Sequence, residues 1–206
     1  MRIDVFSDTV CPWCFIGKRH LEAALARANL SDADIHWRAF QLNPDLPPKG
    51  RDRKEYLQEK FGVSDNIEQL HRQIEAAGRA AGIDFQFGKI SRSPNTFNSH
   101  RLILLAQVQQ RADAMVETLF RAYFLDGLDI GDAGTLARLA QDAGVTGELI
   151  SWLAGGDERT QVLEDLRTAR ELAIDGVPFF IFNNRYALSG AQPVDSFVQA
   201  IQAAQH

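Results

Sequence analysis

The sequence predicts an α/β fold of the order β-α-β … β-β-α, in which strands from both ends of the chain form one sheet around a large all-helical insertion. Two observations predict it. Strand-like segments occur only near the two ends of the chain, and helical apolar spacing fills the interval between them. The length of 206 residues, 45% of them hydrophobic, allows one large domain that carries such an insertion.

The N-terminal end is predicted to form a strand, a helix and a second strand. Residues 1–7 alternate between apolar and polar side chains, which is typical of a short strand. From Pro12 apolar residues recur every three or four positions, which predicts a helix, and proline suits the first turn because its missing N–H would have no partner there. Residues 34–42 predict a second strand, which Asn43 and Pro44 end.

The middle of the chain shows helical spacing, with glycine at several segment ends, as helix C-caps require. The predicted helices are 54–62, 65–82, 95–110, 114–127, 132–144, 147–156 and 158–173. Ser93 is the expected N-cap of the third of them, with Pro94 at the first helical position. The charged run 51–55 (RDRKE) indicates a solvated helix start rather than a binding patch.

Strand signals return near the C-terminus, and a helix closes the chain. These segments are 177–183, 186–190 and 193–205. Because strands lie only at the two ends, the sheet must join N- and C-terminal segments. We therefore expect a discontinuous domain of residues 1–43 and 174–206, interrupted by a helical insertion subdomain of residues 44–173.

Composition excludes two classes of partner. The net charge of −5 argues against a nucleic-acid-binding surface. No apolar run approaches the length needed to span a bilayer, and the first residues, MRIDVFSDT, have no apolar stretch like that of a signal peptide. We therefore expect a cytoplasmic protein that binds neither nucleic acid nor membrane.

The chain has two cysteines, Cys11 and Cys14, close together near its start. In a reducing cytoplasm this pair favours a redox dithiol, a metal half-site or inert thiols over a structural disulfide. A zinc site would need two further ligands. The chain has no other cysteine, and His20 would lie about 240° around the same helix from Cys14. A site of thiol chemistry without a metal is therefore the expected one.

The predicted strand–helix junction assigns a role to each thiol. Cys11 would lie at the helix N-terminus, where unpaired backbone N–H groups and the helix dipole favour a thiolate. Cys14, one turn later, is close enough to attack a mixed disulfide on Cys11. We expect Cys11 to be the exposed nucleophile and Cys14 the more buried resolving thiol. Trp13 either faces the substrate as part of the rim or packs into the protein.

Three segments resemble the DsbA-like thioredoxin-fold family, in particular its FrnE-type cytoplasmic branch: SDTVCPWCFIGK, SPNTFNSHRL and DGVPFFIFNNRYALSGAQP. The resemblance covers almost the whole chain and implies a thioredoxin-like fold. It also implies a cis peptide bond before Pro178, so that Val177 and Pro178 face the cysteines and pair with an extended substrate. From the residues alone, Pro178 equally fits a trans proline at a strand edge.

The resemblance further places Asn95 and His100 near the redox site, on the insertion. The residues themselves fit equally well a capped helix with a polar face. Asp8 is a similar case, and we interpret it as a turn residue rather than as an acid that assists proton transfer.

The favoured function is disulfide exchange with protein or small-molecule thiols and disulfides. No bound cofactor is expected, because the Cys11–Cys14 disulfide is itself the redox group, with glutathione as an optional co-substrate. The FrnE-type resemblance also suggests a link to a polyketide pathway.

Two alternatives belong to other classes. The chain resembles glutathione-dependent 2-hydroxychromene-2-carboxylate isomerases and kappa-class transferases, but these usually have serine at the position of Cys11 and a Gly-x-Asp-Arg segment near the C-terminal helix. Here residues 189–193 read SGAQP. A third interpretation is a redox-sensing or chaperone-like partner that binds unfolded chains through the apolar surface around Trp13.

Overall fold

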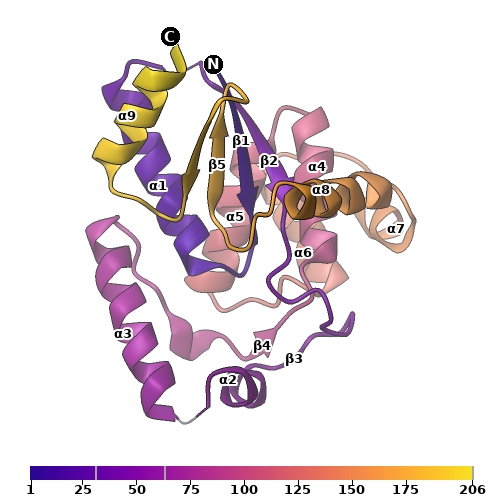
Figure 1. The fold of residues 1–206 in the computed structure, drawn as a ribbon. Coiled ribbons are helices and arrows are strands. Elements are labelled where there is room, and N and C mark those ends of the chain that lie inside the picture. Colours follow the sequence, from indigo (N-terminus) through magenta and orange to yellow (C-terminus); the bar gives the residue numbers. More distant parts are fainter. Residues whose placement is uncertain (31, 63, 206) are drawn as a thin grey trace.

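The computed structural model of the protein describes residues 1–30, 32–62 and 64–205, and its centre is a four-stranded mixed sheet (Figure 1). The strands are β1 (Arg2–Ser7), β2 (Asp34–Ala39), β5 (Phe179–Phe182) and β6 (Tyr186–Ser189), in the spatial order β2-β1-β5-β6. β1 runs parallel to β2 and antiparallel to β5, and β5 pairs with β6 as a hairpin. The sheet therefore joins the two ends of the chain, as the sequence predicts.

Two helices belong to the same unit as this sheet. Helix α1 (Pro12–Arg27) connects β1 to β2, and α9 (Val194–Gln205) follows β6. They lie side by side, to the left of the sheet in Figure 1. The predicted β-α-β … β-β-α order is confirmed, and with it the α/β fold class.

The insertion between β2 and β5 is mainly helical. Its helices are α2 (Arg53–Phe61), α3 (Ser64–Ala80), α4 (Phe97–Val108), α5 (Ala112–Phe124), α6 (Ala133–Asp142), α7 (Leu149–Ala154) and α8 (Arg159–Glu171), with a short 3₁₀ helix at Phe87–Lys89. The expectation of an all-helical insertion needs one correction, because β3 (Arg51–Asp52) pairs antiparallel with β4 (Arg92–Ser93). With two residues each, these strands are too short to show an alternating pattern in the sequence.

Helix α4 begins later than the sequence predicts. Its first residue is Phe97 with Thr96 at the N-cap, whereas Ser93 lies in β4 and Pro94 precedes the helix. The side-chain oxygen of Asn95 accepts a hydrogen bond from the Phe97 amide at 2.9 Å. An asparagine that closes such a turn offers the backbone an alternative to the helix, which explains the later start.

One apolar core runs from the sheet into the insertion. Phe180 and Phe182 of β5 are fully buried, and the ring of Phe180 meets Phe197 of α9 edge-on with centroids 4.7 Å apart. Phe15 of α1 stacks on Phe120 of α5 at 5.0 Å. Because α1 also packs beside α9, Phe15 joins the two halves of the molecule into a single cluster.

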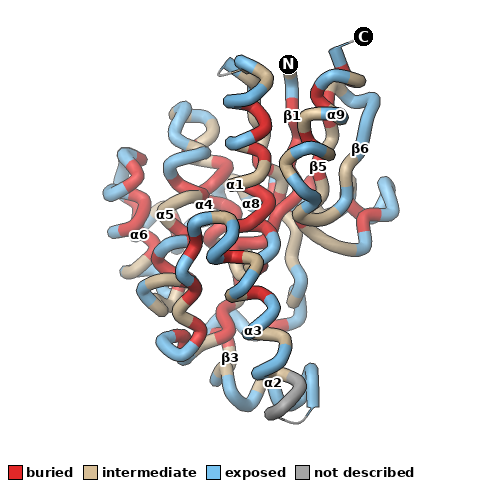
Figure 2. The backbone as a smooth tube through the Cα atoms, turned by 90° about the vertical axis from the view of Figure 1, so that its left-hand side faces the viewer, coloured by how far each residue is buried: buried red, intermediate tan, exposed pale blue. Residues whose placement is uncertain are grey.

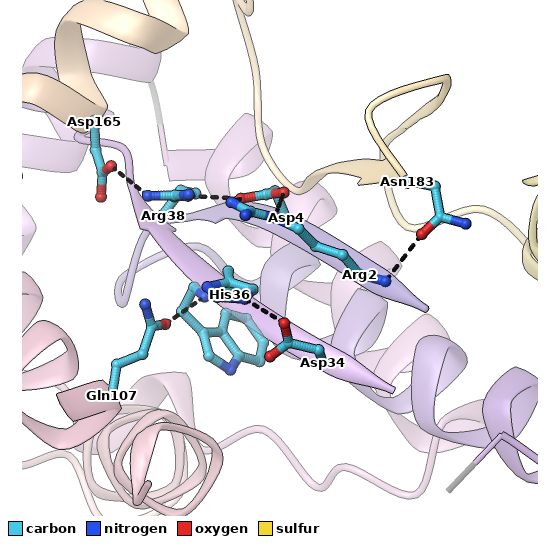
Figure 3. A network of polar contacts seen from close by, with 9 residues as sticks. Arg2, Asp4, Asp34, His36, Arg38, Gln107, Asp165 and Asn183 are labelled. Carbon is cyan, nitrogen blue, oxygen red and sulfur yellow. Dashed lines mark hydrogen bonds and ion pairs between the residues drawn. The ribbon is translucent and has the colours of Figure 1, made fainter. Parts of the chain in front are cut away.

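A chain of ion pairs ties the sheet to α8 (Figure 3). Nε of Arg38 on β2 lies 2.7 Å from the Asp4 carboxylate on β1, and Nη1 lies 3.2 Å from Asp165 on α8. Burial raises the pKa of Asp165 above its ordinary value. For Asp4, burial alone would raise the pKa, but hydrogen bonds and charge from Arg2 and Arg38 lower it. The network therefore keeps at least the Asp4 carboxylate charged beneath α8.

Helices α2 and α3 lie at the lower end of the molecule, apart from the sheet (Figure 1). Helix α2 contains no buried residue, and Figure 2 shows it in pale blue and tan. Helix α3 contacts α1. No helix within the described ranges is long and apolar enough to cross a membrane.

Candidate active site

The turn after β1 places Cys11 at the N-terminus of α1. The Cys11 amide donates to the carbonyl of Asp8 at 3.0 Å, and Cys11 is the N-cap of the helix, with extended dihedral angles (φ −94°, ψ 112°). Pro12 follows in the first turn, which contains no acidic residue. The Cys11 side chain therefore lies beside the unpaired N–H groups and the positive end of the dipole of α1.

Cys14 lies one turn further along α1 and is 1% exposed. Its amide donates to the carbonyl of Cys11 at 3.1 Å. Burial raises the pKa of the Cys14 thiol well above its ordinary value, and the adjacent Cys11 sulfur raises it further. The Ser7 hydroxyl and the Asp8 backbone act in the opposite direction without cancelling the rise. Both thiols are free in this structure.

The expectation that Cys11 is exposed needs correction. Cys11 is only 4% exposed, because its Sγ lies against the protein and donates to the carbonyl of Val177 at 3.5 Å. It borders a cavity of about 360 Å³, whose lining also includes Trp13, whereas Cys14 does not line it. The Cys11 sulfur is therefore reached through this cavity and not across an open surface.

The loop before β5 forms the wall opposite α1. The Val177–Pro178 peptide bond is cis, and the Pro178 carbonyl accepts a hydrogen bond from the Gly190 amide at 2.8 Å. Val177 lines the cavity together with Cys11. A Cβ on Gly17 of α1 would lie 2.9 Å from Cγ of Pro178. Only glycine at position 17 therefore lets α1 approach this loop so closely. In the sequence, the sign of this close approach is a lone glycine inside an apolar helical stretch.

Trp13 lies on the rim of the cavity. Its side chain is 38% exposed, which is more than a large apolar side chain in a packed core shows. Leu42 and Phe61, which also line the cavity, are similarly exposed. The structure therefore places Trp13 in the lining of the cavity and not in the packed interior, and a contact with substrate stays a prediction.

Asn95 and His100 do not line the cavity. The Asn95 amide group donates to the carbonyl of Leu46 at 2.6 Å, so this side chain holds the turn before α4. His100 is 3% exposed, and its Nε2 lies 3.4 Å from Oδ1 of the fully buried Asp8. Among the described residues, neither Nε2 of His100 nor Oδ1 of Asp8 has a hydrogen-bond partner. The other Asp8 oxygen accepts a hydrogen bond from the Leu42 amide at 2.8 Å, so the Asp8 side chain ties this turn to the chain that follows β2.

A comparison with known protein families assigns almost the whole chain to one family. Residues 2–202 match the family description of the DSBA-like thioredoxin domain. The chain belongs to this family. A protein of Bacillus subtilis (strain 168), YwbO, is 28% identical over 209 residues, which cover 98% of this chain and 96% of YwbO. The crystal structure of the probable DsbA oxidoreductase SCO1869 from Streptomyces coelicolor is 32% identical, with a TM-score of 0.90 over 100% of this chain and 90% of that one.

A more distant DsbA-family structure shares the fold. The cytosolic disulfide reductase DsbM from Pseudomonas aeruginosa, solved with GSH, is 18% identical with a TM-score of 0.70. The alignment covers 100% of this chain and 99% of DsbM. The two chains therefore share one fold over almost their whole length.

Sequence reasoning missed the insertion side of this DSBA-like site. Arg53 and Lys60 of α2, His71 of α3 and Tyr123 of α5 line the cavity. Arg53 belongs to the run that we expected to be solvated, but it is half-buried because its guanidinium donates to the Tyr123 hydroxyl at 2.9 Å. No motif in the sequence links α2 to Cys11, since only the tertiary fold brings them together. Among the described residues, no group of three His, Cys, Asp or Glu side chains is placed to hold a metal ion.

Proposed function

We propose that this DSBA-like protein is a cytoplasmic thiol–disulfide oxidoreductase of the FrnE type that exchanges disulfides through Cys11 and Cys14. One observation carries the proposal. A thiol at a helix N-terminus borders a cavity, and a second, buried thiol follows one helical turn later. The first position favours a nucleophilic thiolate, and the second keeps a resolving thiol out of solvent.

In the first step the Cys11 thiolate attacks one sulfur of a substrate disulfide. A new bond joins Cys11 to that sulfur, the substrate S–S bond breaks, and the other substrate sulfur leaves as a thiolate. The α1 N-terminus stabilises the attacking anion, and the Cys11 amide stays bound to Asp8 throughout because its carbonyl partner is part of the backbone turn.

In the second step Cys14 attacks the sulfur of Cys11 and releases the remaining substrate thiolate. Before the reaction, burial and the neighbouring Cys11 sulfur hold the pKa of Cys14 high. When Cys11 becomes part of the mixed disulfide, its negative charge is gone and that contribution disappears. Cys14 therefore loses its proton more readily once there is an adduct to resolve. The products are a Cys11–Cys14 disulfide and a substrate reduced by two electrons.

The reverse sequence oxidises a dithiol, and a small thiol would return the pair to its reduced form. No bound cofactor takes part, because the electrons reside in the two sulfurs. We propose glutathione as this co-substrate, since it is an abundant cytosolic thiol and the structurally similar DsbM was solved with GSH.

The test compares Cys11→Ser with Cys14→Ser. Reduced wild-type protein should consume a disulfide and release two thiols. Cys14→Ser should stop at a covalent mixed disulfide visible by intact-mass spectrometry, and Cys11→Ser should form no adduct. Full disulfide turnover by Cys11→Ser would overturn the assignment. Glutathione-dependent turnover of a chromene carboxylate that survives loss of both thiols would support the isomerase class instead.

A further inference from the structure

The cavity beside Cys11 has the size of a small-molecule site. Its volume of about 360 Å³ lies within the range of pockets that bind compact ligands. Helices α2 and α3 wall it on one side, and the N-terminus of α1 and the loop before β5 wall it on the other. Because Cys11 is 4% exposed and borders this space, a disulfide must enter it to meet the thiol. A small disulfide fits such an enclosure better than one held within a folded protein.

The walls are largely apolar and aromatic. They include Leu57, Leu70, Ile74, Phe87 and Phe124. The His71 ring stacks on Phe87 with centroids 4.4 Å apart. Burial, reinforced by the charge of Arg53, lowers the pKa of His71, so at neutral pH this ring is a further uncharged aromatic wall. A flat aromatic body is the complement of such a surface.

The charges in the lining have one sign. Arg53 and Lys60 line the cavity, and no Asp or Glu is among its described lining residues. This local excess of positive charge contrasts with the net charge of −5 for the whole chain. A ligand with a negative group is therefore favoured at this site even though the protein as a whole repels it.

Arg53 is held in place without a carboxylate partner. Its guanidinium donates to the Tyr123 hydroxyl at 2.9 Å and lies 5.9 Å from the centres of the Tyr123 and Phe87 rings. Burial raises the pKa of Tyr123 to about 12, so this partner is a neutral phenol. No ion pair joins Arg53 to an acid within residues 1–30, 32–62 and 64–205. The remaining N–H groups of a guanidinium in this setting suit a carboxylate.

Lys60 supplies a second positive charge in the lining of the cavity. Its Nζ donates to Oδ1 of Asn43 at 2.5 Å and to the Tyr56 hydroxyl at 3.0 Å. Both partners are neutral and both line the cavity. The side of the cavity formed by α2 therefore presents two positive charges, one on the exposed Lys60 and one on the half-buried Arg53.

We propose that the cavity selects small aromatic disulfides that carry a carboxylate. The inference rests on the proposed function, because Cys11 must be the attacking thiol. The thiolate of Cys11 joins one aryl sulfur while the other aryl thiolate leaves. Cys14 then displaces the bound aryl thiolate and forms the Cys11–Cys14 disulfide, so the substrate gains the two electrons that the protein loses. In this arrangement Arg53 and Lys60 are binding residues and take no part in the electron transfer.

The test uses two disulfides of the same shape, 4,4′-dithiodibenzoate and the neutral 4,4′-dithiobis(benzamide). The second-order rate constant of the reduced protein with each is divided by that of dithiothreitol with the same compound, which removes their difference in intrinsic reactivity. We expect a normalised preference of about tenfold or more for the dibenzoate, since charge-assisted pairs in a partly desolvated site discriminate by about that factor. Lys60→Gln and Arg53→Gln should each bring the ratio several-fold closer to one.

Lys54→Gln is the matched control. Lys54 lies on the same helix and carries the same charge, but it does not line this cavity, so its ratio should equal that of the wild type. Lys60 is exposed, so its substitution does not endanger the fold. A wild-type ratio near one would overturn the inference, as would an equal fall in Lys54→Gln, which would indicate general surface charge. If neither compound oxidises the protein although another disulfide does, the inference fails and the proposed function stands. If no disulfide oxidises the protein, or if Cys11→Ser reacts equally, the proposed function itself fails.

Discussion

Cys14 lies one helical turn after Cys11, yet only Cys11 borders the cavity. Two residues of sequence therefore separate a thiol that borders the cavity from one that is buried in protein. Burial holds Cys14 as a thiol, and the Cys11 sulfur adds to this effect until an adduct forms. This difference makes the proton on Cys14 the natural control point of the resolving step.

The first prediction concerns the pH dependence of that step. Because the pKa of Cys14 is raised, only a small fraction is ionised at neutral pH, and this fraction grows as the pH rises. In the mixed disulfide the contribution of the Cys11 charge is gone, but burial, the largest cause, still raises the pKa of Cys14. Decay of the Cys11 mixed disulfide should therefore accelerate by about tenfold per pH unit until that pKa is reached. Stopped-flow measurement of the second thiol released, from pH 6 to 10, checks it. Cleavage of the same adduct in Cys14→Ser by added dithiothreitol is the control. A rate independent of pH in this range would contradict the prediction.

The residues predicted from the sequence are those whose chemistry depends on near neighbours. Cys11, Cys14 and Trp13 share one helix start, so local spacing was enough to place them. Asn95 and His100 came from the resemblance, and the structure uses them for a turn and for a buried contact with Asp8. The cavity residues of α2 could not be predicted, because nothing local distinguishes a charge that faces a cavity from one that faces solvent.

At the scale of elements, Lys18 connects α1 to α5. Its side chain is 3% exposed and forms ion pairs with Glu22 of α1 and with Asp113 and Glu117 of α5. Burial alone would lower the pKa of Lys18, but the three carboxylates outweigh it and raise the pKa. Burial would raise the pKa of Glu22, but Lys18 and Arg19 lower it. The helix that carries both thiols is therefore fixed to the insertion by charge as well as by packing.

We predict that Lys18→Met lowers the free energy of unfolding by about 1–3 kcal/mol at pH 7, a value reduced because the carboxylates reach solvent. Because the pKa of Lys18 is raised in the folded protein, the contribution of its charge to the free energy of unfolding is present below about pH 10 and is lost as the pH rises further. The lowered pKa of Glu22 means that its contribution is present above about pH 4 and lost as the pH falls further. Urea unfolding at pH 3, 7 and 9 measures this difference.

The expected difference between wild type and Lys18→Met is therefore similar at pH 7 and 9 and smaller at pH 3. Lys54→Met, at an exposed lysine without an ion pair among the described residues, should change the free energy of unfolding by less than about 0.5 kcal/mol. An undiminished difference at pH 3 would show that packing, and not charge, explains the role of Lys18.

The order of elements was predictable because each long helix has its own apolar spacing. The boundaries were less so. Helix α4 begins at Phe97 and not near Ser93, because the Asn95 side chain closes a turn that competes with helical backbone. The pairing of β3 with β4 involves two residues on each side, too few to leave a pattern. Gly17 owes its importance to Pro178, a partner 161 positions away that no local pattern reveals.

At the scale of the whole molecule, Phe15 makes the sheet and the insertion share one core. The division into residues 1–43 with 174–206 and residues 44–173 stays a prediction about chain order. It does not imply two units of independent stability, because an insertion without α1 would lose the partner of Phe120. A protein whose main core spans both parts of the chain should unfold in one step.

We predict coincident unfolding of the two parts. In a Trp13→Phe/Trp152→Phe variant, fluorescence reports on Trp37 of β2, which is 3% exposed, while far-ultraviolet circular dichroism reports mainly on the insertion helices. Both signals should change at the same urea concentration. They are measured on the same variant, so any change in stability caused by the two substitutions affects both signals equally. Loss of Trp37 fluorescence well before the helical signal would show that the insertion is stable on its own.

Helix α2 contains no buried residue, yet it places Arg53 and Lys60 in the cavity. Substitutions on its cavity-facing side would therefore change which disulfides are admitted at little cost to stability, whereas changes around Cys14 would disturb the core. Under the proposed function, the thiol chemistry of α1 and the charge recognition of α2 would lie on different helices with different tolerance to mutation. Such a separation lets evolution, or a protein engineer, assign new substrates to an unchanged pair of thiols.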